Sequence, residues 1–177
     1  TTAQRVNTTG AVRFNSTTSA AEEFNGTFWK PQGNVLQTVT GSIAASSGNV
    51  TVPLNNTLPT NTEGNQIFSV VFTPISATSR IIISFSITSS HSANSGTNIL
   101  SLFAGTTNIA TSAQRTAQAN AAFALDIDEV YSPGSTAAIT FSARLGNSSN
   151  GTCYCNQIGT TTLGGGLVSS YIIQEIQ

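Results

Sequence analysis

The chain has 177 residues, of which only 7% are charged, and its net charge is −1. An average soluble domain is about 25% charged, so Ser, Thr, Asn and Gly must cover most of the surface. The six basic residues are scattered along the chain and cannot form the positive stripe that binds a phosphate backbone, and no window holds the roughly 20 apolar residues of a membrane-spanning helix. We therefore expect neither a nucleic-acid partner nor membrane insertion.

The N-terminal segment, residues 1–34, combines short apolar runs with a hairpin signal. Short strands are expected at 12–14, 22–24 and 27–29. Asn25-Gly26 forms the turn between the last two, because Asn-Gly between such runs is the strongest local hairpin signal. Three short strands around one Trp bury too little apolar area to be stable alone. The segment must pack against the main domain or against its own copies.

From residue 35 onward the sequence is typical of β structure, with runs of Val, Ile, Thr and Phe bounded by Gly, Pro, Asn and Ser. The expected strands are 35–44, 49–54, 66–73, 80–88, 98–104, 121–131, 137–145 and 167–176, with short pieces near Asn108 and Cys153. Many strands without intervening helices predict a sandwich or barrel, since each antiparallel sheet must bury one face. We predict an all-β, jelly-roll-type antiparallel sandwich of the tumour-necrosis-factor-like kind.

The last expected strand is apolar on both faces. Tyr171 and Ile173 lie on one face, and Val168 and Ile172 on the other. A strand of this kind belongs in the centre of a sandwich or at a subunit interface.

The single histidine and the two cysteines do not form a familiar catalytic or metal site. His91 follows the expected strand 80–88 in a polar loop, where a solvated or hydrogen-bonded side chain is the main expectation and an ion site on an oligomer axis the alternative. Cys153 and Cys155 would share one strand face and cannot bridge each other, so free thiols are expected, with contacts to other chains as the alternative. We predict no catalytic residue, no metal ligand and no cofactor.

An acidic cluster, Asp126, Asp128 and Glu129, places its two Asp residues on one strand face. Calcium takes six to eight oxygen ligands, so two carboxylates favour a solvated cluster at a strand end. The run Gly164-Gly165-Gly166 lacks the Lys and the following helix of a phosphate-binding loop, and we expect a turn there.

Several residues of the first 34 follow one motif. They are Thr2-Ala3-Gln4-Arg5, Gly10, Arg13-Phe14-Asn15, Glu22-Glu23-Phe24-Asn25-Gly26 and Trp29. This pattern resembles the stem-to-tip junction of phage tail fibres and related tail proteins.

The rest of the chain resembles the jelly-roll heads that follow such stems. The matching segments are Val52-Pro53, Thr57-Leu58-Pro59-Thr60-Asn61-Thr62-Glu63-Gly64, Pro74, His91-Ser92-Ala93, Leu102-Phe103, and Gly164-Gly165-Gly166 before the final strand. Together the motifs cover nearly the whole chain. The resemblance implies a stem segment at 1–34, a head domain at 35–177, a homotrimer and a place on the virion.

This resemblance implies adhesion: the protein would bind a host cell-surface glycan or receptor. Other virion tail proteins would be its partners on the particle. A structural cap, trimerisation element or decoration protein without receptor binding is the alternative. A surface-polysaccharide hydrolase is a weaker one, because such enzymes usually pair acidic residues across a cleft and this chain has only seven acids. We predict that the protein is not an enzyme.

Carbohydrate sites combine an aromatic platform with amide and hydroxyl groups, because a sugar ring has an apolar face and a hydroxyl rim. Two loops offer this chemistry: one holds Asn147, Asn150 and Tyr154, and the other places Tyr131 beside Ser132-Pro133-Gly134. Tyr131, Asn147, Asn150 and Tyr154 are therefore the predicted glycan contacts.

Overall fold

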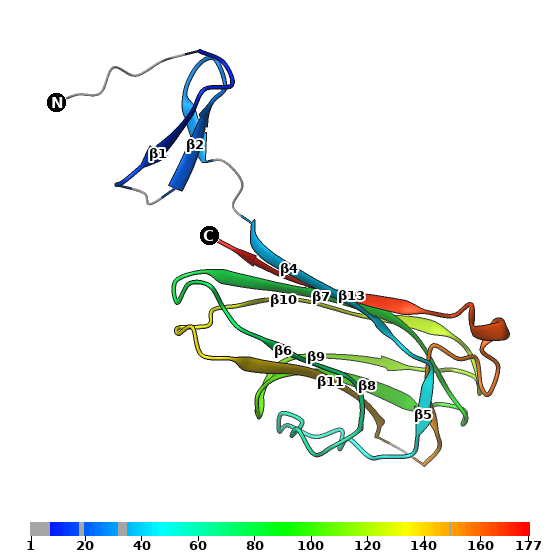
Figure 1. Ribbon diagram of the computed structural model, residues 1–177. Coiled ribbons are helices and arrows are strands. Elements are labelled where there is room, and N and C mark those ends of the chain that lie inside the picture. Colours follow the sequence, from blue (N-terminus) through cyan, green and yellow to red (C-terminus); the bar gives the residue numbers. More distant parts are fainter. Residues whose placement is uncertain (1–7, 18–19, 32–34, 149) are drawn as a thin grey trace.

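The computed structural model describes residues 8–17, 20–31, 35–148 and 150–177, which form a small three-stranded sheet and a two-sheet sandwich (Figure 1). Within that part of the chain the only helical element is a 3-10 turn at Leu163–Gly165. No helix among the described residues is long and apolar enough to cross a membrane. The first motif residues, 2–5, lie outside the described ranges.

The small sheet consists of β1 (Val12–Asn15), β2 (Ala20–Phe24) and β3 (Trp29–Pro31), antiparallel in that order. The predicted Asn25-Gly26 turn joins the last two strands. Asn25 Oδ1 accepts hydrogen bonds from the backbone N–H groups of Thr27 and Phe28, both at 3.0 Å. Gly26 has φ +101°, a backbone conformation that residues other than glycine rarely adopt. The expected hairpin is confirmed.

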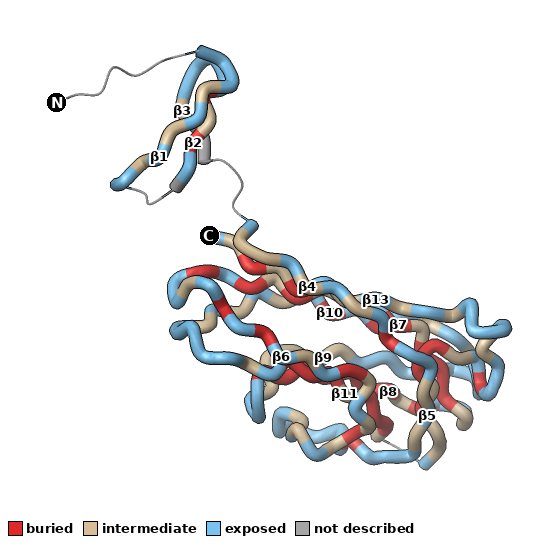
Figure 2. Tube along the Cα trace, viewed as in Figure 1, coloured by how far each residue is buried: buried red, intermediate tan, exposed pale blue. Residues whose placement is uncertain are grey.

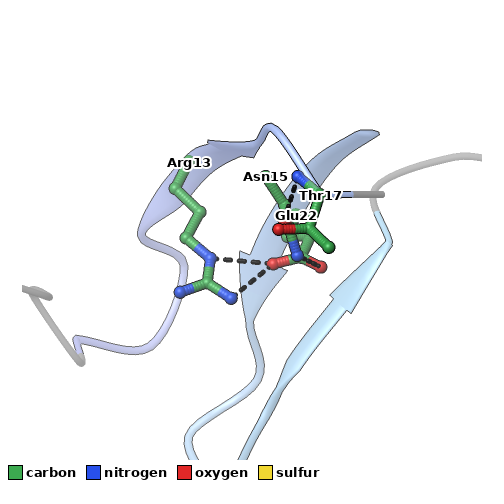
Figure 3. A network of polar contacts seen from close by, with 4 residues as sticks. All are labelled: Arg13, Asn15, Thr17 and Glu22. Atoms are coloured by element: carbon green, nitrogen blue, oxygen red, sulfur yellow. Dashed lines mark hydrogen bonds and ion pairs between the residues drawn. The ribbon is translucent and has the colours of Figure 1, made fainter. Parts of the chain in front are cut away.

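The motif side chains of this sheet contact one another on one of its faces (Figure 3). Arg13 Nε donates to Glu22 Oε2 at 2.8 Å, and Asn15 Nδ2 donates to Glu22 Oε1 at 2.8 Å. The Arg13 guanidinium also lies 4.2 Å from the ring centroid of Trp29, which packs 5.5 Å from Phe24. The motif is therefore an internal network that stabilises the small sheet through a charge-assisted pair and a cation–π contact.

The sandwich holds the remaining strands. They are β4 (Val35–Ile43), β5 (Ser46–Gly48), β6 (Asn65–Phe72), β7 (Arg80–His91), β8 (Thr97–Ala104), β9 (Thr107–Arg115), β10 (Phe123–Tyr131), β11 (Ile139–Asn147), β12 (Cys153–Cys155) and β13 (Ser169–Ile176). One sheet has the order β4-β13-β7-β10, with β12 and β5 continuing it at one end of β7. The other has the order β6-β11-β8-β9.

This strand order is that of a jelly roll. The chain passes repeatedly between the sheets, with β4, β7, β10 and β13 in one and β6, β8, β9 and β11 in the other, and every ladder is antiparallel. Eight strands that cross between two sheets in this way form the two Greek keys of the fold. The predicted jelly-roll-type antiparallel sandwich is confirmed.

The core lies between the two sheets, where Figure 2 shows the buried positions. On β7, Ile81, Ile83, Phe85 and Ile87 alternate with polar or partly exposed residues, as expected of a strand with one buried face. Aromatic rings join the layers, including Phe68 of β6 stacked 4.7 Å from Tyr171 of β13. These contacts cover one of the two apolar faces of the last strand.

Two predicted elements differ from the structure. Residues 49–54 form a loop with an isolated bridge between Thr51 and Asn147, because Pro53 has no N–H and the neighbouring Asn residues favour turns. In contrast, β9 is a full strand of nine residues, where only a short piece near Asn108 was expected. The sequence of this edge strand is polar and shows little apolar alternation. The strand is therefore defined by its pairing with β8.

A buried carboxylate on β13 anchors the loop between β6 and β7. Glu175 has no exposed surface and accepts hydrogen bonds from the backbone N–H groups of Ile75 and Ser76 at 2.9 and 3.0 Å. Ser79 Oγ and Gln37 Nε2 donate to the same carboxylate at 2.5 and 2.6 Å. Burial alone would raise the pKa of Glu175, but these donors lower it to about 2.

Candidate functional site

The outer face of the sheet that contains β7 is rich in hydroxyl groups. Ser84, Ser86 and Thr88 alternate along β7 with its core residues and point away from the second sheet. On one side, β10 places Asp128 opposite Ser84 and Asp126 opposite Ser86. Hydroxyls and carboxylates therefore form cross-strand pairs on this face.

On the other side of β7, the last strand supplies apolar groups. Ile172 lies opposite Ser84 and is 46% exposed, and Val168, just before β13, is 72% exposed. These residues belong to the second apolar face of the final strand. The sequence indicated that this face needs cover, and no described part of the chain fully covers it.

Together these strands border a shallow, open groove with a volume of about 500 Å³, called here the outer groove. Its lining residues are Ser84, Phe85, Ser86, Thr88, Asp126, Asp128, Val168, Ser169, Ser170 and Ile172. The groove has hydroxyls along its floor, two carboxylates on one side and two aliphatic side chains on the other. This is an amphipathic surface on three paired strands.

The two carboxylates of the groove share a face, as the sequence predicted. Ser84 Oγ donates a hydrogen bond to Asp128 Oδ1 at 2.5 Å, which orients that carboxylate over the floor. Among the described residues no group of three or more His, Cys, Asp and Glu side chains could hold a metal ion. The chemistry that the pair offers is hydrogen-bond acceptance and negative charge.

The predicted tyrosines lie at opposite ends of the sandwich. Tyr131 ends β10 opposite Ile81 and packs edge-on against Phe141, with ring centroids 5.5 Å apart. Tyr154 is the middle residue of β12 and lies opposite Ser90. Nine steps along β7 separate the two positions, or roughly 30 Å at about 3.3 Å per residue. The structure does not bring the two tyrosines together.

Asn147 is fully buried as the last residue of β11, and its Nδ2 donates to the Gly151 carbonyl at 3.0 Å. It has no surface to offer a ligand, so the predicted glycan contact is wrong for this residue. Asn150 is exposed beside it, and Tyr154 is half-buried. Tyr131, Asn150 and Tyr154 remain predictions.

His91 is the last residue of β7 and is fully buried, which corrects its expected place in a polar loop. Its Nδ1 accepts a hydrogen bond from the backbone N–H of Ala93 at 3.0 Å. Gly96 and Gly151 close over the ring, since a Cβ on either would lie 2.2 or 2.5 Å from a ring atom. The imidazole therefore has no access to a substrate or to an ion on an oligomer axis.

Both cysteines are free and buried, with their side chains on the same face of β12, as predicted. Burial raises the pKa of Cys153 to about 12 and that of Cys155 to about 11. Cys153 Sγ also donates to Asn98 Oδ1 at 2.9 Å. These thiols stay protonated and lie out of reach of other chains, so they act neither as nucleophiles nor as intermolecular links.

The outer groove was not among the predicted sites. Two signals for it exist in the sequence: the period-two series Ser84, Ser86, Thr88 and the second apolar face of the last strand, which carries Val168 and Ile172. Neither signal indicates which strands lie side by side, and the groove exists only because β10 and β13 flank β7.

No protein-family model matches the sequence, and no curated protein matches it. Among solved structures, the chain is similar to the structure of the Gx strain of infectious bursal disease virus, with 9% identity and a TM-score of 0.46. It is also similar to the crystal structure of the VP2 subviral particle of that virus, with 10% identity and a TM-score of 0.44. The alignments cover 85% of this chain and 34% and 35% of those chains, so the chain spans about a third of their length. Similarity at this level carries no functional argument, and the fold assignment rests on the strand order.

Proposed function

We propose that the chain is the stem junction and head of a virion attachment fibre, which works as a homotrimer and binds a host cell-surface glycan through the outer groove. The observation that carries the binding role is the groove itself, with its hydroxyls, carboxylates and exposed aliphatic side chains. A sugar ring needs this combination, because its hydroxyl rim forms hydrogen bonds while its C–H face packs on apolar groups.

The attachment-fibre part of the proposal is supported by the N-terminal motif. The motif residues Arg13, Asn15, Glu22, Phe24 and Trp29 form one connected network. The residues that carry the sequence resemblance to stem-to-tip junctions therefore belong to one structural unit, which supports reading them as one motif.

Trimerisation is supported by the apolar surface of the small sheet. Val12, Phe14 and Phe28 are largely exposed, and Phe14 is 70% exposed. Val12 and Phe14 lie on the face of β1 opposite the Arg13 network. A three-stranded sheet with so little buried area gains stability when such side chains pack against copies of themselves.

Binding rather than catalysis is the role that fits the chemical groups available. The single histidine has no exposed surface, and both thiols are buried and protonated. Three copies of a modest glycan site on one tip raise the overall affinity through effective concentration, by a factor of about 10² to 10⁴ over a single site. Attachment to a repetitive surface needs no stronger site.

The test is binding of the purified chain to a panel of bacterial cells and to their isolated surface polysaccharides. Ser86→Trp fills the groove and is expected to weaken binding at least tenfold. Ser69→Trp makes the same change at an exposed position of β6 on the other sheet and is expected to leave binding unchanged. Thermal unfolding of both variants shows whether the sandwich is intact. Equal binding by both variants would remove the groove from the proposal.

Oligomeric state is tested separately by light scattering at micromolar concentration, where three times the chain mass is expected. The double variant Val12→Ser, Phe14→Ser is expected to shift the mass towards the monomer. A monomeric mass of the unaltered chain would contradict the trimer. A trimer that binds no cell or polysaccharide would favour a purely structural cap.

A further inference from the structure

The outer groove also indicates which class of glycan it accepts. We infer that it binds uncharged or amino-bearing saccharides and excludes those that carry carboxylate, sulfate or phosphate groups. This inference rests on the proposed function, since it assigns a ligand class to the same groove. It follows from the charges and hydrogen-bonding groups of the lining residues.

The electrostatic part of the argument concerns Asp126 and Asp128. Both side chains are exposed on the outer face of β10 and border the groove. None of the described residues that line the groove is Arg, Lys or His, so no positive side chain there compensates the two carboxylates. An anionic sugar would meet like charges at close range on a protein whose net charge is already −1. Such ligands are disfavoured.

The hydrogen-bonding part leads to the same class. Carboxylates only accept hydrogen bonds, whereas sugar hydroxyls and amines donate them. The hydroxyls of Ser86 and Thr88 and of Ser170, across the groove, can both donate and accept, so they suit the hydroxyl rim of a neutral sugar. A sulfate or carboxylate group offers only acceptors, so it cannot donate to Asp126 or Asp128 where it takes the place of a sugar hydroxyl.

An amino group has a particular place in this arrangement. Asp126 and Asp128 are two residues apart on one strand face, or roughly 7 Å along the strand. A protonated amine between them could donate to both carboxylates, and charge-assisted bonds of this type are about twice as strong as neutral ones. Val168 and Ile172 on the opposite side would pack against the C–H face of the same ring.

The experiment compares three sets of oligosaccharides of matched length: neutral ones, ones with free amines and ones with uronate or sulfate groups. Binding is measured calorimetrically at low and at physiological salt. Neutral and amino oligosaccharides are expected to bind, and anionic ones at least tenfold more weakly. The preference for amino over neutral sugars is expected to shrink as salt screens the charges.

The double variant Asp126→Asn, Asp128→Asn tests the role of the carboxylates. It is expected to lower the ratio of the affinities for amino and neutral sugars about tenfold. It is also expected to reduce the difference in affinity between neutral and anionic sugars. Because Asp128 accepts a hydrogen bond from Ser84, Asp126→Asn alone serves as a second variant that leaves this contact in place. Glu63→Gln, on a distant exposed loop, is the matched control and is expected to keep the wild-type preferences.

Four results would overturn the inference. Preferred binding of anionic oligosaccharides, or unchanged ratios in the double variant, would refute the ligand class while the binding function stands. Binding that survives Ser86→Trp would show that the groove is not the site. Absence of binding by every saccharide would refute both this inference and the proposed function.

Discussion

Replacing Glu175 with Gln is expected to destabilise the sandwich strongly and in a pH-dependent way. The carboxylate accepts hydrogen bonds from two backbone amides, a serine hydroxyl and a glutamine amide. Glu175→Gln removes the charge and turns an NH₂ donor towards these donors. The loop between β6 and β7 loses its anchor to β13, because those donors can no longer all be satisfied.

The magnitude follows from the pKa of Glu175, which is about 2 in the folded protein against 4.5 for an unperturbed glutamate. A lowered pKa stabilises the fold wherever the carboxylate is ionised, so the contribution is complete above about pH 6 and is lost as the pH falls towards 2. At about 1.4 kcal/mol per unit of pKa difference, the stabilisation amounts to about 3 kcal/mol at neutral pH. It falls to less than half of that at pH 3 and is nearly lost at pH 2.

Urea unfolding of the wild type and of Glu175→Gln at pH 7, 5 and 3, at one fixed protein concentration, measures this difference. Glu63→Gln is the control, since Glu63 accepts one hydrogen bond from the Thr60 amide on an exposed loop and should cost less than about 1 kcal/mol. The reasoning fails if Glu175→Gln costs less than about 1 kcal/mol at pH 7, or if its cost does not decrease in acid.

Two further predictions concern the buried end of β7 and its neighbour β12. Cys153 and Cys155 should resist a thiol reagent at pH 8 in the native protein, because burial raises their pKa values to about 12 and about 11. Both should react once urea unfolds the protein. Rapid labelling of the native protein would contradict the burial of the thiols. Gly96→Ala should cost about 1 to 3 kcal/mol by overpacking, since the new Cβ would lie 2.2 Å from His91 Nδ1. Gly166→Ala, whose Cβ meets only a carbonyl oxygen at 3.2 Å, is the comparison, and equal losses would argue against a tight His91 site.

The features of this fold that could be predicted from the sequence are those that local pattern determines. The alternation of Ile81, Ile83 and Phe85 with partly exposed residues predicts one strand with one buried face, and the structure places it at the centre of a sheet. Asn25-Gly26 predicts a turn because few residues other than Gly adopt the positive φ found there. These signals lie within a few residues of the elements they specify.

The features that were missed depend on contacts between distant segments. Strand β9 is polar and is defined by its pairing with β8, so its own residues carry little of the signal. His91 was expected in a solvated loop because its neighbours are polar, yet Gly96 and Gly151 close over it from other parts of the chain. Asn147 was expected at the surface for the same reason, and its amide is instead bonded within the fold.

The outer groove shows how one local pattern can serve both the fold and the site. A shift of one residue in the pairing of β10 with β7 would turn Asp126 and Asp128 into the core and expose Leu125 and Ile127. Burying two unpaired carboxylates is costly, so the pair opposes this shift while it gives the groove its charge. Replacing both Asp residues with Asn removes this barrier to the shift, but Leu125 and Ile127 remain buried on the inner face and still fix the register of β10. The Asn variants therefore test the ligand chemistry of the groove rather than the fold.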